Sequence, residues 1–256
     1  MEILNATGIS KIYKGKFSCK VLTDIDLSVQ EGEFVGIMGP SGSGKTTLLN
    51  MMSTIDSPTA GKILINGKNP FQLTSEDLAL FRRRKLGFVF QSFNLLNTLT
   101  VKENIVLPMT LEGMAVKEMN KRAQEIARKC SITGILNKRT FEISGGQAQR
   151  TAIARAIIQK PQLLFADEPT GNLDSKSSFD VMEILKALNK KEKTTIMLVT
   201  HDPYVASYCS RVIFIKDGRL YNEIYSGESR SNFYQKITRL NSVVGGKIND
   251  YSSVCI

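Results

Sequence analysis

One stretch of the chain combines the residue types that bind a nucleotide phosphate. It consists of Gly39, Pro40, Ser41, Gly42, Ser43, Gly44, Lys45 and Thr46. The stretch matches the phosphate-binding loop G-x-x-x-x-G-K-[ST] at every defined position. In such a loop the backbone N–H groups surround an anion. Lys45 is expected to reach the β- and γ-phosphates, and the Thr46 hydroxyl is expected to hold Mg²⁺. The alternative, a glycine-rich turn without a ligand, leaves the adjacent lysine and threonine unexplained.

The residues on either side of this loop predict the elements that the chemistry requires. Residues 34–38 are apolar and indicate a short buried strand, and residues 47–52 indicate the start of a helix. The loop is therefore expected at a helix N-terminus, where free N–H groups attract anions. Thr47, the first residue of that helical segment, belongs to the expected nucleotide-binding set.

Two acidic residues follow the apolar run 163–166. A carboxylate at the end of such a strand can hold Mg²⁺ through water, and Asp167 fits that role. Glu168, one residue further, is placed to polarise an attacking water. The alternative is a surface strand that ends in two solvated acids. The phosphate loop elsewhere in the chain favours the catalytic interpretation.

A second glycine pair opens the predicted helix 144–160, in the order Ser144, Gly145, Gly146 and Gln147. Two glycines at a helix start let a ligand approach the backbone, and the N–H groups there suit a phosphate. On its own this composition is also an ordinary helix cap. Together with the phosphate loop and the Asp-Glu pair, it predicts a second contact to the nucleotide.

The elements that position these residues can be predicted from the apolar pattern. Residues 88–90, 163–166 and 196–199 are short apolar runs, each followed by a polar residue. This pattern is typical of a mostly parallel sheet with its functional residues at the strand ends. Residues 101–111 and 116–131 lack strand alternation and favour helices within a helical region at about 92–160.

The first part of the chain predicts an antiparallel β layer. Ile25, Leu27 and Val29 alternate with polar residues, as in a half-buried strand. Asn66-Gly67 follows an apolar run and predicts a tight hairpin turn, and Asp217-Gly218 predicts a second one.

The bulk composition is that of a globular protein, with 42% apolar and 23% charged residues among 256. No apolar run approaches the ~20 residues of a membrane-spanning helix, and the first residues do not resemble a signal peptide. A cytosolic protein is expected. The cysteines form no C-x-x-C pair, so neither a zinc site nor a disulfide framework is expected. They are Cys19, Cys130, Cys209 and Cys255.

The net charge of +10 indicates an anionic neighbour. Charge alone leaves nucleic acid, a nucleotide and an acidic membrane surface open. The densest basic run, residues 82–85, is interpreted equally well as a solvated helix face.

The three nucleotide motifs together resemble the nucleotide-binding subunits of ABC transporters, over residues 1–226. Residues 39–46 correspond to the Walker A motif, 163–167 to Walker B and 144–147 to the signature motif, here preceded by Ile143 where leucine is commoner. The resemblance implies an α/β P-loop NTPase fold. That fold has a RecA-like, mostly parallel sheet, an N-terminal antiparallel β layer and an inserted helical subdomain at about 92–160. Residues 227–256 would then be a C-terminal extension, with a helix at 233–240 and a loose tail.

The resemblance also implies roles for residues that composition does not single out. Gln91 resembles the Q-loop glutamine that touches Mg²⁺ and senses the membrane partner. His201 resembles the switch histidine that contacts the γ-phosphate, and Asp174 resembles the D-loop aspartate. Tyr13 lies where the family stacks an aromatic ring on adenine. ATP and Mg²⁺ are the implied ligands, with Glu168 as the general base, oriented with His201.

In this family two copies pair head to tail. Each ATP then lies between the Walker A motif of one copy and the signature motif of the other. A single cassette with complete motifs implies a homodimer. Hydrolysis of ATP would release the pair, with Lys45 and Mg²⁺ stabilising the developing charge.

A finer resemblance is to the exporter group that includes macrolide export, lipoprotein release, cell division and peptide-antibiotic resistance. Residues 81–91 and 167–174 look like that group. The branch for bacitracin and lantibiotic detoxification is the most similar, on residues 92–104, 202–203, 206–209, 211–218 and 233–237. In that branch the permease has ten membrane spans and a large external domain, and the complex often signals to a sensor histidine kinase. The ATPase would then lie at the cytoplasmic face of the membrane.

Rival classes share some of these motifs. ATPases of DNA repair insert a long coiled coil between the Walker motifs, and the interval from Thr46 to Asp167 leaves no room for one. Translation factors of the ABC type carry two cassettes, and this chain has one. A binding module without catalysis would lack Glu168 or His201, and both are present. Because the DNA-repair and translation classes do not fit this chain, nucleic acid is not an expected partner.

Overall fold

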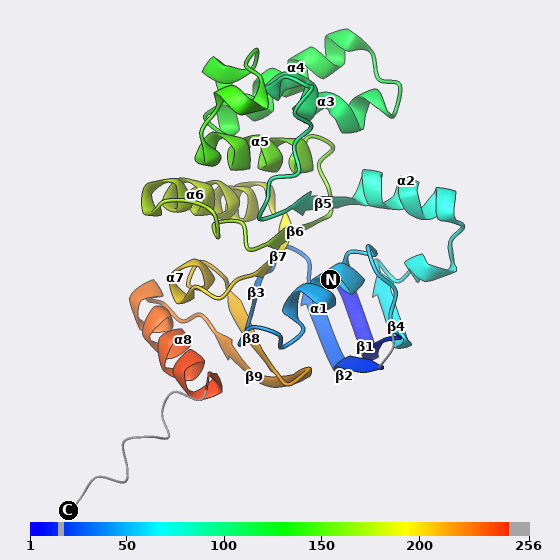
Figure 1. Ribbon diagram of the computed structural model, residues 1–256, viewed down its shortest axis with the longest axis vertical. Helices are drawn as coiled ribbons and strands as arrows, with labels where there is room; N and C mark the ends of the chain where they lie inside the picture. Colours follow the sequence, from blue (N-terminus) through cyan, green and yellow to red (C-terminus); the bar gives the residue numbers. More distant parts are fainter. Residues whose placement is uncertain (15–17, 246–256) are drawn as a thin grey trace, which may run out of the picture. The chain divides into compact units, whose positions relative to one another are not determined.

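The computed structural model describes residues 1–14 and 18–245, and they form two compact units (Figure 1). The first unit contains residues 1–72 and the chain from Met197 onward, and the second contains residues 73–196. The boundary falls within strand β7 (Thr195–Val199). Within the described ranges, no helix is both long and apolar enough to span a bilayer.

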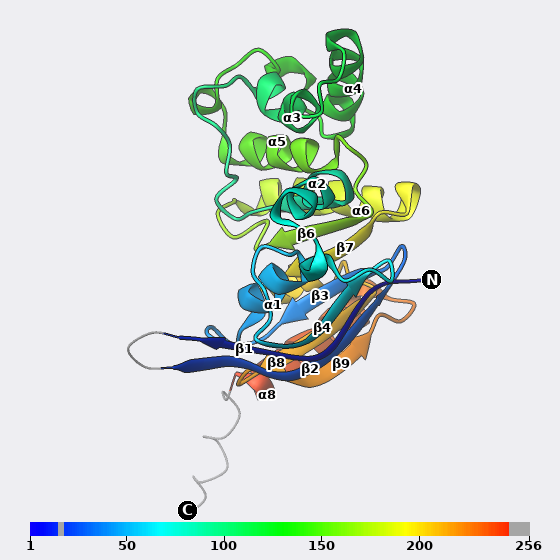
Figure 2. The ribbon, with the colours of Figure 1, turned by 90° about the vertical axis from the view of Figure 1, so that its right-hand side faces the viewer.

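The first unit holds the predicted antiparallel β layer. β1 (Glu2–Tyr13) is the central strand, between β2 (Cys19–Gln30) and β4 (Ala60–Ile65), and Figure 2 shows the three side by side. In β2 the apolar residues at 25, 27 and 29 are buried, whereas Asp24 and Asp26 are exposed. This alternation confirms the prediction of a half-buried strand.

A parallel strand pair positions the phosphate loop. β3 (Phe34–Met38) is buried at every residue and lies parallel to β8 (Arg211–Lys216). β8 turns at Asp217-Gly218 into antiparallel β9 (Arg219–Tyr225), which confirms the second predicted hairpin.

The first predicted hairpin is only partly correct. Asn66 and Gly67 have positive φ angles and form the tight turn, which a bridge between Ile65 and Lys68 closes. No second strand follows in the structure, because the chain enters a 3₁₀ turn at Pro70–Gln72. Proline lacks the N–H group that would continue the ladder.

The C-terminal part of the first unit is helical. α8 (Arg230–Val244) contains the predicted helix 233–240 and buries Phe233 and Ile237. It begins earlier than predicted because Ser229 caps it. The predicted loose tail lies mostly beyond residue 245, outside the described residues. The remaining helices of this unit are α1 (Lys45–Met52) and the single turn α7 (Pro203–Ala206).

The second unit combines two parallel strands with helices. β5 (Leu86–Val89) pairs with β6 (Leu163–Asp167), with Phe88 opposite Phe165. β5 ends at Val89, one residue before the predicted end. The helices are α2 (Ser75–Lys85), α3 (Val101–Thr110), α4 (Val116–Lys129), α5 (Gly145–Ile157) and α6 (Ser175–Glu192), with 3₁₀ turns η2 (Thr133–Ile135) and η3 (Thr140–Glu142).

Candidate active site

The phosphate loop joins β3 to α1, as predicted. Gly39 has φ +152°, and a Cβ atom there would lie 2.1 Å from the carbonyl oxygen of Ile215. Gly44 has φ +99°, and a Cβ atom there would lie 2.7 Å from the Leu22 side chain. Both positions therefore require glycine, since any side chain would be strained and would clash.

The loop fits an anion. Gly44 is the N-cap of α1 and supplies no side-chain cap, and no acidic residue lies in the first turn. The Ser43 hydroxyl is buried and has no hydrogen-bond partner in the part of the chain that the structure describes. An uncapped helix N-terminus beside an unpartnered buried hydroxyl is what a bound phosphate would satisfy.

Lys45 is buried and folds back over the loop. Its Nζ donates to the carbonyl oxygens of Gly39 at 3.0 Å and Pro40 at 2.7 Å. These two bonds hold the ammonium group at the loop, where it can meet phosphate oxygens. Thr46, the next residue, is exposed.

Tyr13, at the end of β1, is fixed at its hydroxyl and exposed at its ring. The hydroxyl donates to Asp56 Oδ2 at 2.8 Å and contacts the Thr47 side chain. Lys11 Nζ donates to Asp56 Oδ1 at 2.6 Å and lies 4.8 Å from the centre of the Tyr13 ring. Partial burial raises the pKa of Asp56, but the hydrogen bonds from Lys11 and Tyr13 outweigh it and hold that pKa below its ordinary value.

His201 is exposed and lies two residues after the end of β7, in the first unit. The backbone N–H of buried Thr200 donates to the Ile37 carbonyl at 3.1 Å, which places this turn beside the end of β3. The N–H of Asp202 donates to the Thr200 hydroxyl at 3.1 Å, and its carboxylate accepts the N–H of Tyr204 at 2.8 Å. His201 therefore lies in a turn that is hydrogen-bonded on both sides.

In the second unit, Asp167 is the last residue of β6, and Glu168 turns the chain. Glu168 has φ +46°, a left-handed conformation that costs a non-glycine residue about 1 kcal/mol. Its carbonyl accepts the Gly171 N–H at 3.0 Å, which closes a tight turn. Strained turns of this kind cluster at functional sites.

Gln91 is joined to the segment that follows Glu168. Its Nε2 donates to Asn172 Oδ1 at 3.3 Å, and Asn172 Nδ2 donates back to the Gln91 carbonyl at 3.2 Å. A Cβ atom at Gly171 would lie 2.7 Å from Gln91 Nε2. The predicted Q-loop and D-loop therefore pack directly on each other.

The predicted signature motif caps α5 and touches α6. Ser144 and Gln147 form a reciprocal capping box, as their spacing suggests. A Cβ atom at Gly146 would lie 2.6 Å from Ser177 Oγ. Asp174 caps α6, and hydrogen bonds from the backbone and hydroxyl of Ser177 lower the pKa of its carboxylate.

The predicted site residues thus form two groups. The first unit brings together the phosphate loop, Tyr13 and His201. The second unit brings together Asp167, Glu168, Gln91, residues 144–147 and Asp174. Sequence reasoning missed Asp56, Asn172 and Gln149. Of these three, Gln149 alone left a signal, as a polar residue on the mostly apolar buried face of α5.

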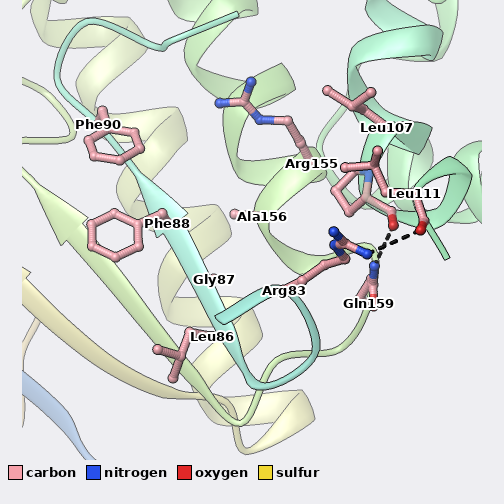
Figure 3. Close-up of a pocket in the computed structure, with 11 residues that line it drawn as sticks. Arg83, Leu86, Gly87, Phe88, Phe90, Leu107, Leu111, Arg155, Ala156 and Gln159 are labelled. Carbon is pink, nitrogen blue, oxygen red and sulfur yellow. Dashed lines mark hydrogen bonds between the residues drawn. The ribbon is translucent and has the colours of Figure 1, made fainter. Parts of the chain in front are cut away.

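The second unit also contains an apolar pocket of about 280 Å³ beside β5 (Figure 3). Arg83 donates to the Leu111 carbonyl at 3.1 Å, and Gln159 donates to the Pro108 carbonyl at 2.8 Å. Glu112 pairs with Arg84 at 2.7 Å and with Arg83 at 3.3 Å, so its single carboxylate offsets one positive charge of the basic run 82–85. The lining residues are Arg83, Leu86, Gly87, Phe88, Phe90, Leu107, Pro108, Leu111, Arg155, Ala156 and Gln159.

Comparison with known proteins decides the family. The family described as ABC transporter matches residues 22–171, which includes the phosphate loop and the segment through Gly171. The chain belongs to the ABC transporter ATP-binding family. This ABC ATPase is 60% identical over 253 residues to the ABC transporter ATP-binding protein YxdL of Bacillus subtilis, with 99% of this chain and 98% of the relative covered.

Two further likenesses bear on function. This ABC ATPase is 51% identical over 253 residues to the bacitracin export ATP-binding protein BceA of Halalkalibacterium halodurans, with 98% of this chain and 100% of that protein covered. It also matches the dimeric post-hydrolysis structure of the ATP-binding cassette MJ0796 bound to ADP and Pi. That match has a TM-score of 0.82 and 40% identity, and it covers 88% of this chain and 100% of the cassette.

This ABC ATPase is therefore an ATP hydrolase of the α/β fold class, the ATP-binding subunit of an ABC exporter, and uses Mg²⁺ with ATP. The oxygen donors that the sequence predicts for the ion are a hydroxyl, a carboxylate and a side-chain amide, which are hard ligands that suit Mg²⁺. They belong to Thr46, Asp167 and Gln91.

Proposed function

We propose that this protein is the ATPase subunit of a transporter that detoxifies antimicrobial peptides, and that it drives a separate membrane permease. The observation that carries the proposal is the 51% identity to a bacitracin export ATPase over nearly the whole of both chains. This match covers 98% of the chain, whereas the match to the shorter cassette MJ0796 covers 88%. The likeness to the bacitracin export protein therefore extends beyond the residues shared with that cassette.

In the proposed reaction, the phosphate loop binds the triphosphate. The N–H groups of residues 39–46 and the Lys45 ammonium neutralise the β- and γ-phosphates. The Thr46 hydroxyl, Asp167 and Gln91 would hold the ion, and Mg²⁺ would supply charge stabilisation to the phosphate oxygens when bound. Tyr13 stacks on adenine, with Thr47 beside it.

Glu168 is the proposed general base. It orients the attacking water and accepts its proton, and the turn that closes on Gly171 fixes its backbone. His201 contacts the γ-phosphate and orients the same water. Two copies pair as a homodimer, so that Ser144, Gly145, Gly146, Gln147 and Asp174 of one copy complete the ATP site of the other.

The pocket of Figure 3 is the proposed contact for the permease. Its lining is mostly apolar, and three of the lining residues belong to β5, which ends two residues before Gln91. Arg155 lies at the same place and donates to the carbonyls of Asn94 at 2.6 Å and Phe93 at 2.9 Å. A permease segment in the pocket would therefore press on the loop that carries Gln91. This would hold the ATPase at the cytoplasmic face of the membrane.

The test is recovery of the native complex. The tagged protein is purified from detergent-solubilised membranes, and its companions are identified by mass spectrometry. A ten-span permease with one large external domain is the expected companion, with a sensor histidine kinase bound through it. Recovery of a four-span permease would contradict the peptide-detoxification role in favour of lipoprotein, macrolide or cell-division complexes. Recovery with DNA or ribosomes alone would overturn the transporter role.

A matched pair of variants tests the pocket. Leu111 is exposed at the pocket rim, and Leu111→Asp places a charge where the permease segment would pack. Loss of the permease from the purified complex is expected. Val116→Asp, at an exposed residue of α4 that does not line the pocket, is the control and should leave the complex intact. Equal recovery with both variants would place the permease elsewhere.

A further inference from the structure

A cluster of one arginine and two tyrosines joins the C-terminal helix to the segment that carries His201. Arg230, the first residue of α8, lies 4.3 Å from the centre of the Tyr208 ring and 5.4 Å from the centre of the Tyr204 ring. The whole cluster lies within the first unit.

The two tyrosines form one surface for the arginine. Their rings meet edge to face at 5.7 Å between centroids, and their hydroxyl oxygens are 3.2 Å apart. Tyr208 is nearly buried, and burial together with the Tyr204 hydrogen bond raises its pKa to about 12. The Tyr208 hydroxyl therefore stays neutral, and the π faces of the two rings attract the cation.

The segment that these tyrosines belong to cannot hold its shape alone. α7 is one turn long, and an isolated turn of helix is unstable in water. The Asp202 cap and the hydrogen bond from the Ser207 hydroxyl to the Tyr204 carbonyl at 2.6 Å support it locally. Further support comes from the buried side chains of Val205 and Ala206 in α7 itself, and from α8, which is anchored by buried Phe233 and Ile237.

His201 lies at the start of this segment. Asp202, its neighbour, is both the cap of α7 and a hydrogen-bond donor to Thr200. A shift of α7 would therefore move the turn that presents the His201 ring. Placement errors of about 1 Å at a catalytic group are enough to lower a reaction rate greatly.

We propose that α8 is a brace for the active site and that Arg230 is a positioning residue, which acts through Tyr204 and Tyr208 to hold His201 in its catalytic orientation. This inference rests on the proposed role of His201. It gives the C-terminal helix a function in ATP hydrolysis rather than in ATP binding. Arg230→Ala is therefore expected to lower kcat and to leave the KM for ATP unchanged.

The experiment measures steady-state ATP turnover and nucleotide affinity of the full-length protein. Arg230→Ala should lower kcat about fivefold, from loss of an exposed cation–π contact with two rings, with KM and the Kd for a fluorescent ATP analogue within twofold. Arg230→Lys keeps the cation and should recover at least half of the activity. Arg239→Ala removes the same charge from the same helix, has no ring contact among the described residues, and should match the wild type. Unchanged kcat in Arg230→Ala would overturn the proposal.

A double-variant cycle separates positioning from general stability. In single-turnover assays, Arg230→Ala should add no further loss when His201 is already alanine. An equal loss in both backgrounds would show that Arg230 acts independently of His201, and would overturn the proposal. If His201→Ala alone keeps wild-type turnover, the proposed role of His201 fails, and the brace fails with it. If His201→Ala strongly lowers turnover but the single variant Arg230→Ala keeps the wild-type rate, the role of His201 stands and the brace alone fails.

Discussion

The side-chain amide of Gln149 donates a hydrogen bond of 2.6 Å to the carbonyl oxygen of Pro169. The same amide nitrogen lies 3.3 Å from the carbonyl oxygen of Phe90. One fully buried side chain on α5 therefore ties together the residue before Gln91 and the residue after Glu168. The helix that begins at the signature motif is thus bonded to both loops of the second unit that carry proposed catalytic residues.

Gln149→Leu is expected to destabilise the protein by about 1–3 kcal/mol, because it leaves the buried carbonyl of Pro169 without its donor. Urea unfolding followed by circular dichroism measures the change. The control is Gln124→Leu, at an exposed glutamine of α4 in the same unit. A loss below about 0.5 kcal/mol, which is the usual scatter of surface substitutions, would contradict the structural role.

Asp56→Ala is expected to weaken ATP binding about threefold to tenfold, because the Tyr13 hydroxyl loses the acceptor that fixes the ring proposed to stack on adenine. Affinity for tripolyphosphate, which has no base to stack, should not change. Competition against a fluorescent ATP analogue measures both. If tripolyphosphate binding weakens equally, Asp56 supports the phosphate loop and not the adenine contact.

The same carboxylate predicts a pH dependence of stability. Because the folded protein holds the pKa of Asp56 below its ordinary value, the charged form stabilises the fold above the unfolded pKa of about 4. That contribution is lost as the pH falls through the folded pKa. Both pKa values lie below roughly pH 5. The difference in unfolding free energy between wild type and Asp56→Asn should therefore be constant from about pH 5 to 7 and should shrink at lower pH. A difference that grows on acidification would contradict this sign.

Lys45→Ala is expected to abolish productive ATP binding, because it removes the ammonium group that the carbonyls of Gly39 and Pro40 hold at the loop. Isothermal titration with MgATP measures the loss. Lys62→Ala, at an exposed position of β4, is the control and should bind as the wild type does. Retained binding by Lys45→Ala would contradict the placement of the triphosphate.

Much of the fold was predictable because its signals are local. The apolar run 34–38, the glycines of the loop and the caps at Ser144 and Asp174 act on residues a few positions away. The turn at Asn66-Gly67 was predictable for the same reason. The absence of a second strand after this turn was not predictable from the turn residues, because Pro70 begins a 3₁₀ turn and cannot donate to a strand ladder.

The contacts that join distant segments left little trace in the sequence. Asp56 meets Tyr13 and Arg230 meets Tyr208 only after the chain has folded, and no spacing rule connects these pairs. Gln149 is the exception, since a polar residue on an apolar helix face requires a buried partner. Which partner it meets depends on tertiary packing.

The central claim is that two copies of this chain enclose ATP and that Glu168 hydrolyses it. Glu168→Gln keeps the shape of the side chain and removes the base. Size-exclusion chromatography with light scattering, run with and without MgATP, tests the claim most directly. We expect Glu168→Gln to be monomeric without nucleotide and dimeric with ATP, while its turnover falls at least ~100-fold. Lys45→Ala in the same background should stay monomeric. A Glu168→Gln protein that remains monomeric at saturating ATP, or that turns ATP over at the wild-type rate, would contradict the account.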